Sequence, residues 1–281
     1  MARNSIHKLR EWKASGQRFA MMTAYDYPGA RLLEQAGVPV LLVGDTLGSV
    51  VLGYDSTVPV TLEDILHHTR PVVRATEKAV VVADMPFMSY QANADDAVRN
   101  AGRLLQEGGA TAVKLEGGSR VAPLVHRMVD AGIPVMGHLG LTPQSLNQFG
   151  GHKVQAKTPA AAARLLNDAQ ALEAAGAFAV VLEVIPAPLS KAVSERLSIP
   201  TIGIGAGPHC DGQVQVFHDL LGIYDDRRVL KHTRRYAVLG ETIRNAVREY
   251  VADVESGAFP TEANSFPMEE GTLREVVAHA V

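Results

Sequence analysis

The feature that most constrains the fold is the alternation of short apolar runs, rich in β-branched residues, with longer segments of helical periodicity. The runs are Phe19–Tyr25, Pro39–Gly44, Ala79–Ala83, Thr111–Leu115, Pro134–Gly137, Ala177–Leu182 and Pro200–Ile204. Most of them are almost continuously apolar, as expected of parallel strands that are covered on both faces. The sequence therefore predicts a parallel α/β fold with at least these seven strands.

The segments between the runs carry helix start and stop signals. Thr61 and Asp64 form a capping-box pattern ahead of an apolar stripe. Further helices are expected after Asn93, from Thr158 to Gly176, near Ile6–Ala14 and near Gly240–Val254. This order of elements leaves two architectures, a β/α barrel and an open doubly wound sheet.

The position of the glycines favours the barrel. A dinucleotide-type G-x-G-x-x-G turn after the first strand is missing from the sequence. We therefore predict a (β/α)8 barrel (TIM barrel) with an extra N-terminal helix. A length of 281 residues fits one large domain, and we expect a single catalytic domain over residues 1–266 followed by a C-terminal tail over residues 267–281.

Composition excludes several classes of function. Lys plus Arg number 27 against 30 Asp plus Glu, and no basic tract is present, so nucleic acid is not an expected partner. No apolar run reaches the ~18 residues that cross a membrane, and the N-terminal residues lack the apolar centre of a secretory signal. Cys210 is the one cysteine, which excludes a disulfide framework. We expect a cytoplasmic protein.

Ionisable residues follow or end five successive strands. They are Asp45, Asp84, Lys114 with Glu116, His138 and Glu183. The carboxyl ends of barrel strands form one rim, where the active sites of such barrels lie. Lys114 and Glu116 are two positions apart, so both side chains point to the same side of their strand. We therefore expect a functional site at this rim.

Charge repulsion between the carboxylates limits the functions that this site can have. Two carboxylates about 4 Å apart repel by ~4 kcal/mol at an effective dielectric constant of 20, so clustering Asp45, Asp84 and Glu116 requires cations beyond Lys114. Oxygen ligands without cysteine favour Mg²⁺. A magnesium ion beside a separate carboxylate, Glu183, is suited to polarising an oxo acid and removing its α-proton.

Two glycine-containing segments are less specific. Gly203–Gly207 (GIGAG) is compatible with a phosphate-binding loop and equally with tight backbone packing. Residues 141–155 are too polar for a strand and too glycine-rich for a helix, which makes them a candidate lid.

Several long motifs resemble the ketopantoate hydroxymethyltransferase family, which catalyses the first committed step of pantothenate biosynthesis. The matching strings are MTAYDYPGA, VGDTLGSVVLGYDSTVPVT, VVVADMPFMSY, AVKLEGG, VMGHLGLTPQS, VVLEVIP and TIGIGAGPHCDGQVQVFHDLLG. The resemblance extends from about Ile6 to Phe266. It implies a barrel of the phosphoenolpyruvate/pyruvate type that transfers the one-carbon unit of 5,10-methylenetetrahydrofolate to 3-methyl-2-oxobutanoate, giving 2-dehydropantoate. It also implies a homo-oligomer, commonly a decamer.

The resemblance assigns a role to each residue of the rim. Asp45, Asp84 and Glu116 match Mg²⁺ positions, with Glu116 acting in part through water. The oxo-acid contacts match Asp45, Thr46, Asp84 and Lys114, the polar partner is His138, and the proton acceptor is Glu183. Thr46 departs from the family's usual serine, which bears on substrate affinity rather than on the type of reaction.

Three alternative functions remain open at this point. A lyase or mutase of the same barrel class would use the same enolate chemistry on another acid. A Schiff-base aldolase would use Lys114 as the nucleophile. A catalytically silent scaffold would bind ligand without exchanging a proton.

Overall fold

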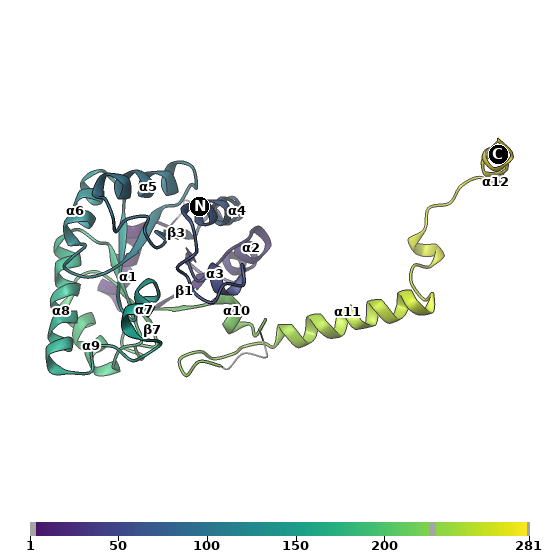
Figure 1. The fold of residues 1–281 in the computed structure, drawn as a ribbon. Helices are drawn as coiled ribbons and strands as arrows, with labels where there is room; N and C mark the ends of the chain where they lie inside the picture. Colours follow the sequence, from purple (N-terminus) through teal and green to yellow (C-terminus); the bar gives the residue numbers. More distant parts are fainter. Residues whose placement is uncertain (1–3, 225–228, 280–281) are drawn as a thin grey trace. The chain divides into compact units, whose positions relative to one another are not determined.

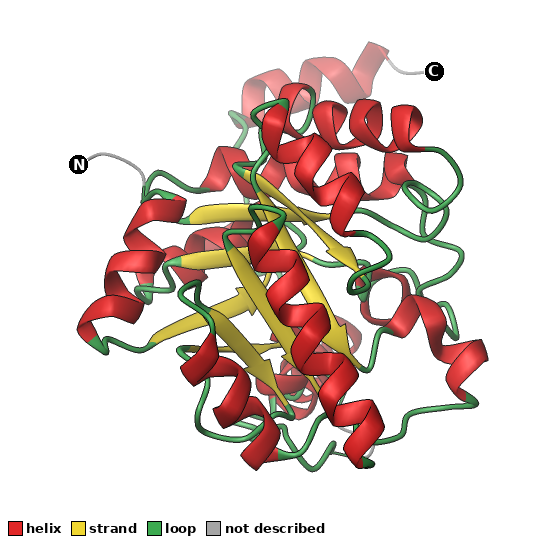
Figure 2. Ribbon diagram, turned by 90° about the vertical axis from the view of Figure 1, so that its left-hand side faces the viewer, coloured by secondary structure: helices red, strands yellow, loops and turns green. Residues whose placement is uncertain are grey.

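The computed structural model describes residues 4–224 and 229–279. Contacts within the chain divide these residues into two compact units: residues 4–220 with 229–234, and residues 221–224 with 235–279. The first unit is a closed barrel of parallel strands surrounded by helices (Figures 1 and 2).

The barrel strands follow one another in chain order, and β1 pairs with both β2 and β8, which closes the sheet. The strands are β1 (Phe19–Thr23), β2 (Val40–Val43), β3 (Val80–Asp84), β4 (Ala112–Glu116), β5 (Val135–Gly140), β6 (Ala179–Glu183), β7 (Thr201–Ile204) and β8 (Gly212–Gln215). The predicted (β/α)8 barrel is confirmed.

In the described part of the chain, the helices of this unit are α1 (Ile6–Ser15), α2 (Tyr27–Gln35), α3 (Leu47–Val50), α4 (Leu62–Ala75), α5 (Ala94–Gln106), α6 (Ala122–Asp130), α7 (Leu146–Phe149), α8 (Pro159–Ala174), α9 (Ala187–Arg196) and α10 (Phe217–Leu220). The helices expected near Ile6–Ala14, after Thr61, after Asn93 and from Thr158 to Gly176 are confirmed as α1, α4, α5 and α8. The predicted capping box opens α4: the Thr61 hydroxyl accepts from the Asp64 backbone N–H at 3.1 Å, and the Asp64 carboxylate accepts from the Thr61 N–H at 2.9 Å.

The extra N-terminal helix packs against the core of the barrel. Leu9 of α1 is fully buried in the same apolar cluster as Phe19 and Met21. Trp12 stacks on Phe19 with ring centroids 5.6 Å apart. Because Phe19 begins β1, α1 covers the amino ends of the strands and leaves the carboxyl ends, the rim, for the site.

The segment after β7 departs from the regular alternation of strand and helix. Residues 205–211 connect β7 to β8 without a helix, and β8 was not predicted because its residues, GQVQ, contain one apolar side chain. Gly207 has φ +83°, and a Cβ there would lie 2.4 Å from the Cβ of Ala187. Close packing therefore accounts for a glycine at this position of the GIGAG segment.

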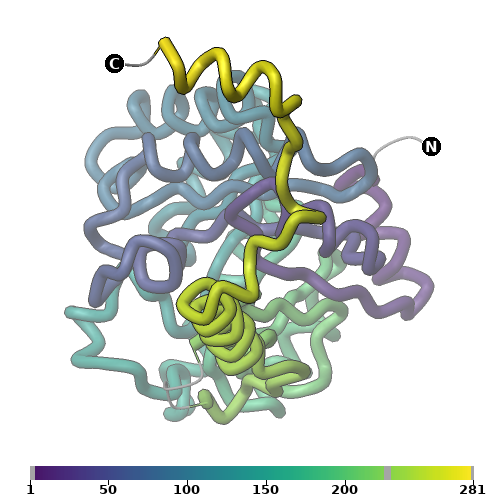
Figure 3. The backbone as a smooth tube through the Cα atoms, turned by 90° about the vertical axis from the view of Figure 1, so that its right-hand side faces the viewer, coloured from purple at the N-terminus to yellow at the C-terminus, as the bar shows by residue number. Residues whose placement is uncertain are grey.

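The second unit contains α11 (Leu239–Ser256), a 3₁₀ turn η2 (Glu262–Asn264) and α12 (Glu270–His279), coloured yellow-green to yellow in Figure 3. All α11 residues from Glu241 to Ser256 are exposed. The barrel unit thus covers residues 4–220 with 229–234. A catalytic domain that extends over residues 1–266 stays a prediction. Among the described residues, no helix combines the length and apolarity needed to cross a bilayer.

Candidate active site

The strand register brings the predicted rim residues together. Asp84 pairs with Lys114 across β3 and β4, and Glu116 pairs with His138 across β4 and β5. Glu183 ends β6 and pairs with Gly140 at the end of β5. Asp45 follows β2 directly, and the half-buried Thr46 lies at the start of α3. The side chains that we expected at this rim therefore lie on neighbouring strand ends.

Asp84 links two of these residues. One of its oxygens, Oδ2, accepts a hydrogen bond from the Asp45 backbone N–H at 2.9 Å. The other, Oδ1, lies 2.7 Å from Lys114 Nζ in a buried ion pair. Burial alone would lower the pKa of Lys114, but Asp84, Glu116 and Asp45 outweigh it and raise that pKa above its ordinary value. Lys114 is therefore held as a protonated ammonium.

His138 lies between the remaining charged groups. Its Nε2 is 3.1 Å from Glu183 Oε2, and its Nδ1 is 3.6 Å from Glu116 Oε1 and 3.3 Å from Lys114 Nζ. Burial and Lys114 each lower the pKa of His138, but Glu116 and Glu183 outweigh them and raise it to about 9. The imidazole is therefore cationic at neutral pH and faces both glutamates.

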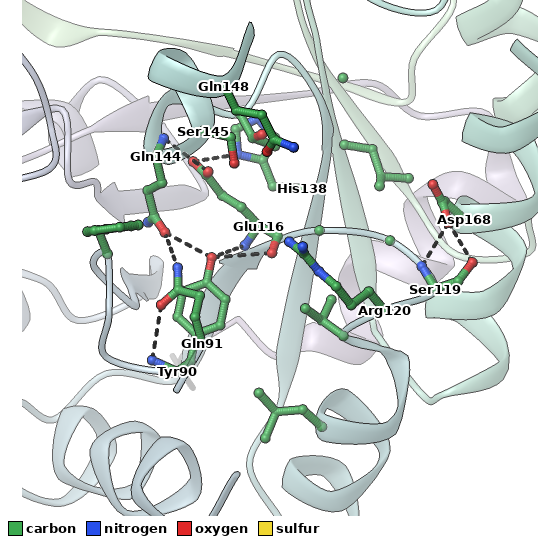
Figure 4. Close-up of a pocket in the computed structure, with 18 of the residues that line it drawn as sticks. Tyr90, Gln91, Glu116, Ser119, Arg120, His138, Gln144, Ser145, Gln148 and Asp168 are labelled. Atoms are coloured by element: carbon green, nitrogen blue, oxygen red, sulfur yellow. Dashed lines mark hydrogen bonds and ion pairs between the residues drawn. The ribbon is translucent and has the colours of Figure 1, made fainter. Parts of the chain in front are cut away.

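Gln144 is a central residue that the sequence analysis did not identify. Its Nε2 donates to Asp45 Oδ2 at 2.9 Å and to the Met85 carbonyl at 3.0 Å, and its backbone N–H donates to Glu116 Oε2 at 3.1 Å. Its Oε1 accepts from the Tyr90 hydroxyl and from Gln91 Nε2, each at 2.9 Å (Figure 4). Nothing in the local sequence, LTPQS, marks this glutamine, because its partners come from distant parts of the chain.

The segment that holds Gln144 is more regular than expected. Residues 143–145 form a 3₁₀ helix, η1, and Leu146–Phe149 form α7, which ends at Gly150 with φ +66°. The prediction that residues 141–155 are too glycine-rich for a helix was therefore wrong for residues 143–149, because the glycines follow the helix and cap it. A lid movement of this segment stays a prediction.

The rim carries an excess of negative charge. Four carboxyl groups, those of Asp45, Asp84, Glu116 and Glu183, face two cations, Lys114 and protonated His138. Burial, reinforced by Asp84 and Glu116, raises the pKa of Asp45 to about 8. The raised pKa means that burial and the neighbouring negative charges disfavour the ionised form of Asp45. A further cation would offset those negative charges. The net charge of the cluster suits a divalent ion.

The donor set fits Mg²⁺ with a limited number of direct protein ligands. Glu116 Oε1 is buried without a hydrogen-bond partner in the described part of the chain. No three His, Cys, Asp or Glu side chains in residues 4–224 and 229–279 are arranged as a ready metal site. Mg²⁺ is commonly held by one or two carboxylates and completes its shell with water or substrate oxygens. The arrangement fits that pattern and not a closed protein cage.

A cavity of about 1150 Å³ opens from this rim. Glu116, His138 and Gln144 line what we call its inner end. Its outer end, where the β4–α6 loop meets α8, is lined by Ser119, Arg120, Arg164 and Asp168. Apolar side chains, among them Leu124, Phe149 and Leu165, also contribute to its walls. The cavity is large enough for a ligand of the size of a typical drug or cofactor.

A parallel β/α barrel with buried ionisable groups at the carboxyl ends of its strands defines an enzyme of the TIM-barrel class. The family described as ketopantoate hydroxymethyltransferase matches residues 3–262. The chain belongs to the ketopantoate hydroxymethyltransferase family, and it is a transferase.

Curated relatives match over nearly the full length. The chain is 58% identical over 274 residues to a 3-methyl-2-oxobutanoate hydroxymethyltransferase of Dehalococcoides mccartyi (strain CBDB1), with 98% of each chain covered. It is 57% identical over 276 residues to the enzyme of that name from Carboxydothermus hydrogenoformans, covering 98% of this chain and 100% of the relative. The family resemblance seen in the sequence motifs is confirmed.

Solved structures share the fold at low sequence identity. A phosphonopyruvate hydrolase in complex with oxalate and Mg²⁺ superposes with a TM-score of 0.60 at 15% identity, covering 99% of this chain and 96% of the other. A 2,3-dimethylmalate lyase of the PEP mutase/isocitrate lyase superfamily gives a TM-score of 0.57 at 17% identity, with 98% and 99% covered. These likenesses confirm the predicted β/α-barrel fold.

Proposed function

We propose that this enzyme transfers the one-carbon unit of 5,10-methylenetetrahydrofolate to C3 of 3-methyl-2-oxobutanoate, giving 2-dehydropantoate. The observation that carries the proposal is the pairing of a buried acidic cluster with one separate, more exposed carboxylate. Asp45, Asp84, Lys114, Glu116 and His138 each expose 5% or less of their surface. The Glu183 side chain, in contrast, is 17% exposed, so it can reach a bound substrate.

Asp45 and Asp84 would hold Mg²⁺, with Glu116 contributing in part through water. When bound, Mg²⁺ supplies Lewis-acid stabilisation of the negative charge that develops on a keto oxygen. Asp45, Thr46, Asp84 and Lys114 would contact the oxo acid. Lys114, held protonated by its carboxylate neighbours, offsets the negative charge of the substrate.

Glu183 would accept the C3 proton. The His138 imidazolium lies 3.1 Å from Glu183 Oε2 and would orient this carboxylate toward the substrate. The electrons of the C3–H bond pass to the enolate, and C3 forms the new bond to the folate methylene carbon. Over the whole reaction both bonds from the methylene carbon to the folate nitrogens break, and one water supplies the hydroxyl group on that carbon. Tetrahydrofolate leaves with the other hydrogen of the water and the hydrogen from C3.

The protonation of Lys114 argues against the Schiff-base alternative. A nucleophilic lysine needs a lowered pKa, whereas the carboxylates around Lys114 raise its pKa. The lyase and scaffold alternatives are less well supported, because the relatives over 98% of the chain are named as hydroxymethyltransferases. A homodecamer and a cytoplasmic location stay predictions from the sequence.

The substitution Glu183→Gln tests the assignment of the base. It keeps the size of the side chain and removes its capacity to accept a proton. We expect C3–H exchange of 3-methyl-2-oxobutanoate in D2O and product formation to fall together by roughly 10²- to 10⁴-fold. Glu195→Gln, on the exposed face of α9, is the matched control. Wild-type exchange in Glu183→Gln would show that another group removes the proton.

A further inference from the structure

The cavity is larger than one substrate requires. It holds about 1150 Å³, and a five-carbon oxo acid at the rim would occupy a small part of its inner end. The reaction proposed above joins two substrates, and the second must place its methylene carbon next to C3. Glu116 and His138 belong both to the rim and to the lining of this cavity. The cavity therefore adjoins the proposed place of the oxo acid, and its outer end could accommodate the remainder of the second substrate.

Two arginines line the outer end of the cavity. Arg120 follows Ser119 in the β4–α6 loop, and Arg164 lies on α8. In the described part of the chain, neither guanidinium has a carboxylate within ion-pair distance. Exposed arginines without partners are common, but here two of them line the same cavity. Figure 4 shows the Arg120 side chain in the space between Glu116 on one side and Ser119 with Asp168 on the other.

The acidic side chain that is nearest to Arg164 in the sequence already accepts hydrogen bonds from another residue. Asp168 lies one helical turn after Arg164, yet its Oδ1 accepts from the Ser119 N–H at 2.8 Å and from the Ser119 hydroxyl (Figure 4). A Cβ at Gly118 would lie 2.1 Å from Asp168 Cγ, so a glycine is required for this close approach. Asp168 therefore fixes the β4–α6 loop, and with it Arg120, rather than neutralising Arg164.

A pair of guanidiniums at one end of a cavity is suited to an anionic ligand. Arginine binds carboxylates through two parallel hydrogen bonds, and such charge-assisted bonds are stronger than neutral ones. A reduced folate carries its carboxylates only on the glutamyl arm. Its benzoyl group is uncharged. Its reactive methylene carbon lies at the opposite end, on the pteridine. The two arginines lie at the outer end of the cavity, so the anionic end of the folate would face them while its reactive end lies at the rim.

We propose that Arg120 and Arg164 bind the glutamyl carboxylates of the folate co-substrate, while its pteridine lies at the inner end near Glu116 and His138. This assignment rests on the proposed use of 5,10-methylenetetrahydrofolate. Leu124 and Leu165 also line this cavity, and their apolar side chains are suited to contact the aminobenzoyl ring.

The test compares wild type with Arg120→Gln, Arg164→Gln and the double variant. Each arginine removed should raise the KM for 5,10-methylenetetrahydrofolate roughly tenfold, equivalent to about 1.4 kcal/mol. The KM for 3-methyl-2-oxobutanoate and the rate of C3–H exchange without folate should not change, because neither involves the outer end. Arg99→Gln, an exposed arginine of α5 paired with Asp96, serves as the control.

A truncated co-substrate makes the test specific. The methylene derivative of tetrahydropteroate lacks the glutamyl arm, so wild type and double variant should use it with equal KM. An equal loss with the truncated and the full co-substrate, or an unchanged folate KM in the double variant, would overturn the assignment. If wild type exchanges C3–H but forms no product from 5,10-methylenetetrahydrofolate, the proposed function itself fails, and this result is distinguishable because no variant is needed to obtain it.

Discussion

The two ends of the cavity differ in how their charges are balanced. At the inner end, charged side chains contact one another: Lys114 pairs with Asp84, and His138 lies between Glu116 and Glu183. At the outer end, Arg120 and Arg164 have no carboxylate partner among the described residues. The inner end therefore has a network in place before substrate arrives, whereas the outer end acquires its partner only from a ligand. Substitutions at the two ends should consequently affect different steps.

The largest loss is expected from Asp84→Asn at the inner end. The amide keeps an oxygen for the Asp45 N–H but loses the charge that faces Lys114 at 2.7 Å and would hold Mg²⁺. We expect kcat/KM to fall by a hundredfold or more and the Mg²⁺ concentration for half activity to rise, since even outer partners of a metal site contribute 10- to 100-fold. Steady-state assays over a Mg²⁺ series measure both, and Asp96→Asn is an exposed control. Unchanged Mg²⁺ dependence would contradict the metal assignment.

The Gln144→Leu substitution should cause the next largest loss. It removes the donation to Asp45 Oδ2 and the acceptor for Tyr90 and Gln91, while the backbone N–H to Glu116 remains. We expect a loss of roughly 10- to 100-fold in Mg²⁺ affinity and kcat. Calorimetric Mg²⁺ titration separates this positioning role from a general loss of stability. Wild-type Mg²⁺ affinity in a folded Gln144→Leu protein would show that Gln144 does not position the metal ligands.

Mg²⁺ affinity should depend on pH. The pKa of Asp45 is raised from 3.8 to about 8 in the metal-free protein. The proton on Asp45 therefore stabilises the fold fully below about pH 4, and this contribution is lost as the pH rises through about 8. Mg²⁺ must displace this proton, so its affinity should rise by up to tenfold per pH unit below about pH 8 and then level off. Calorimetry in buffers of different ionisation enthalpy measures the released proton. An affinity that is constant from pH 6 to pH 8, with no proton released, would contradict this electrostatic description.

Thr46→Ser should have the smallest effect. The half-buried Thr46 keeps its hydroxyl and backbone N–H in the serine variant and loses one methyl group. We expect the KM for 3-methyl-2-oxobutanoate to change by less than about threefold, because only packing beside the rim is altered. Steady-state kinetics at saturating folate provide the measurement. A change above tenfold would assign the methyl group a direct role in shaping the pocket.

The charged residues of the inner end were predictable from the sequence because local sequence signals mark them. Asp84, Lys114 and Glu116 end apolar runs, and parallel strands of a closed barrel bring such ends to one rim without further information. The predicted helix starts rest on equally local signals, such as the capping box at Thr61.

The parts that the sequence did not reveal depend on long-range contacts. Gln144 is 99 positions from Asp45 and sits in an ordinary polar loop. Its neighbour in the network, Tyr90, donates to it from the segment after β3. The short, polar β8 is a strand because β1 and β7 flank it, not because of its own residues. The division of the chain near residue 220 likewise reflects contacts that composition does not encode.

The most direct test of the central claim is proton NMR of the purified protein with 3-methyl-2-oxobutanoate and 5,10-methylenetetrahydrofolate, run with Mg²⁺ and with excess chelator. It follows C3–H exchange and 2-dehydropantoate in the same sample. We predict exchange and product with Mg²⁺, and neither when the chelator is in excess. Product formed at the same rate in chelator, or no exchange under either condition, would contradict an enolising, metal-assisted site at the barrel rim.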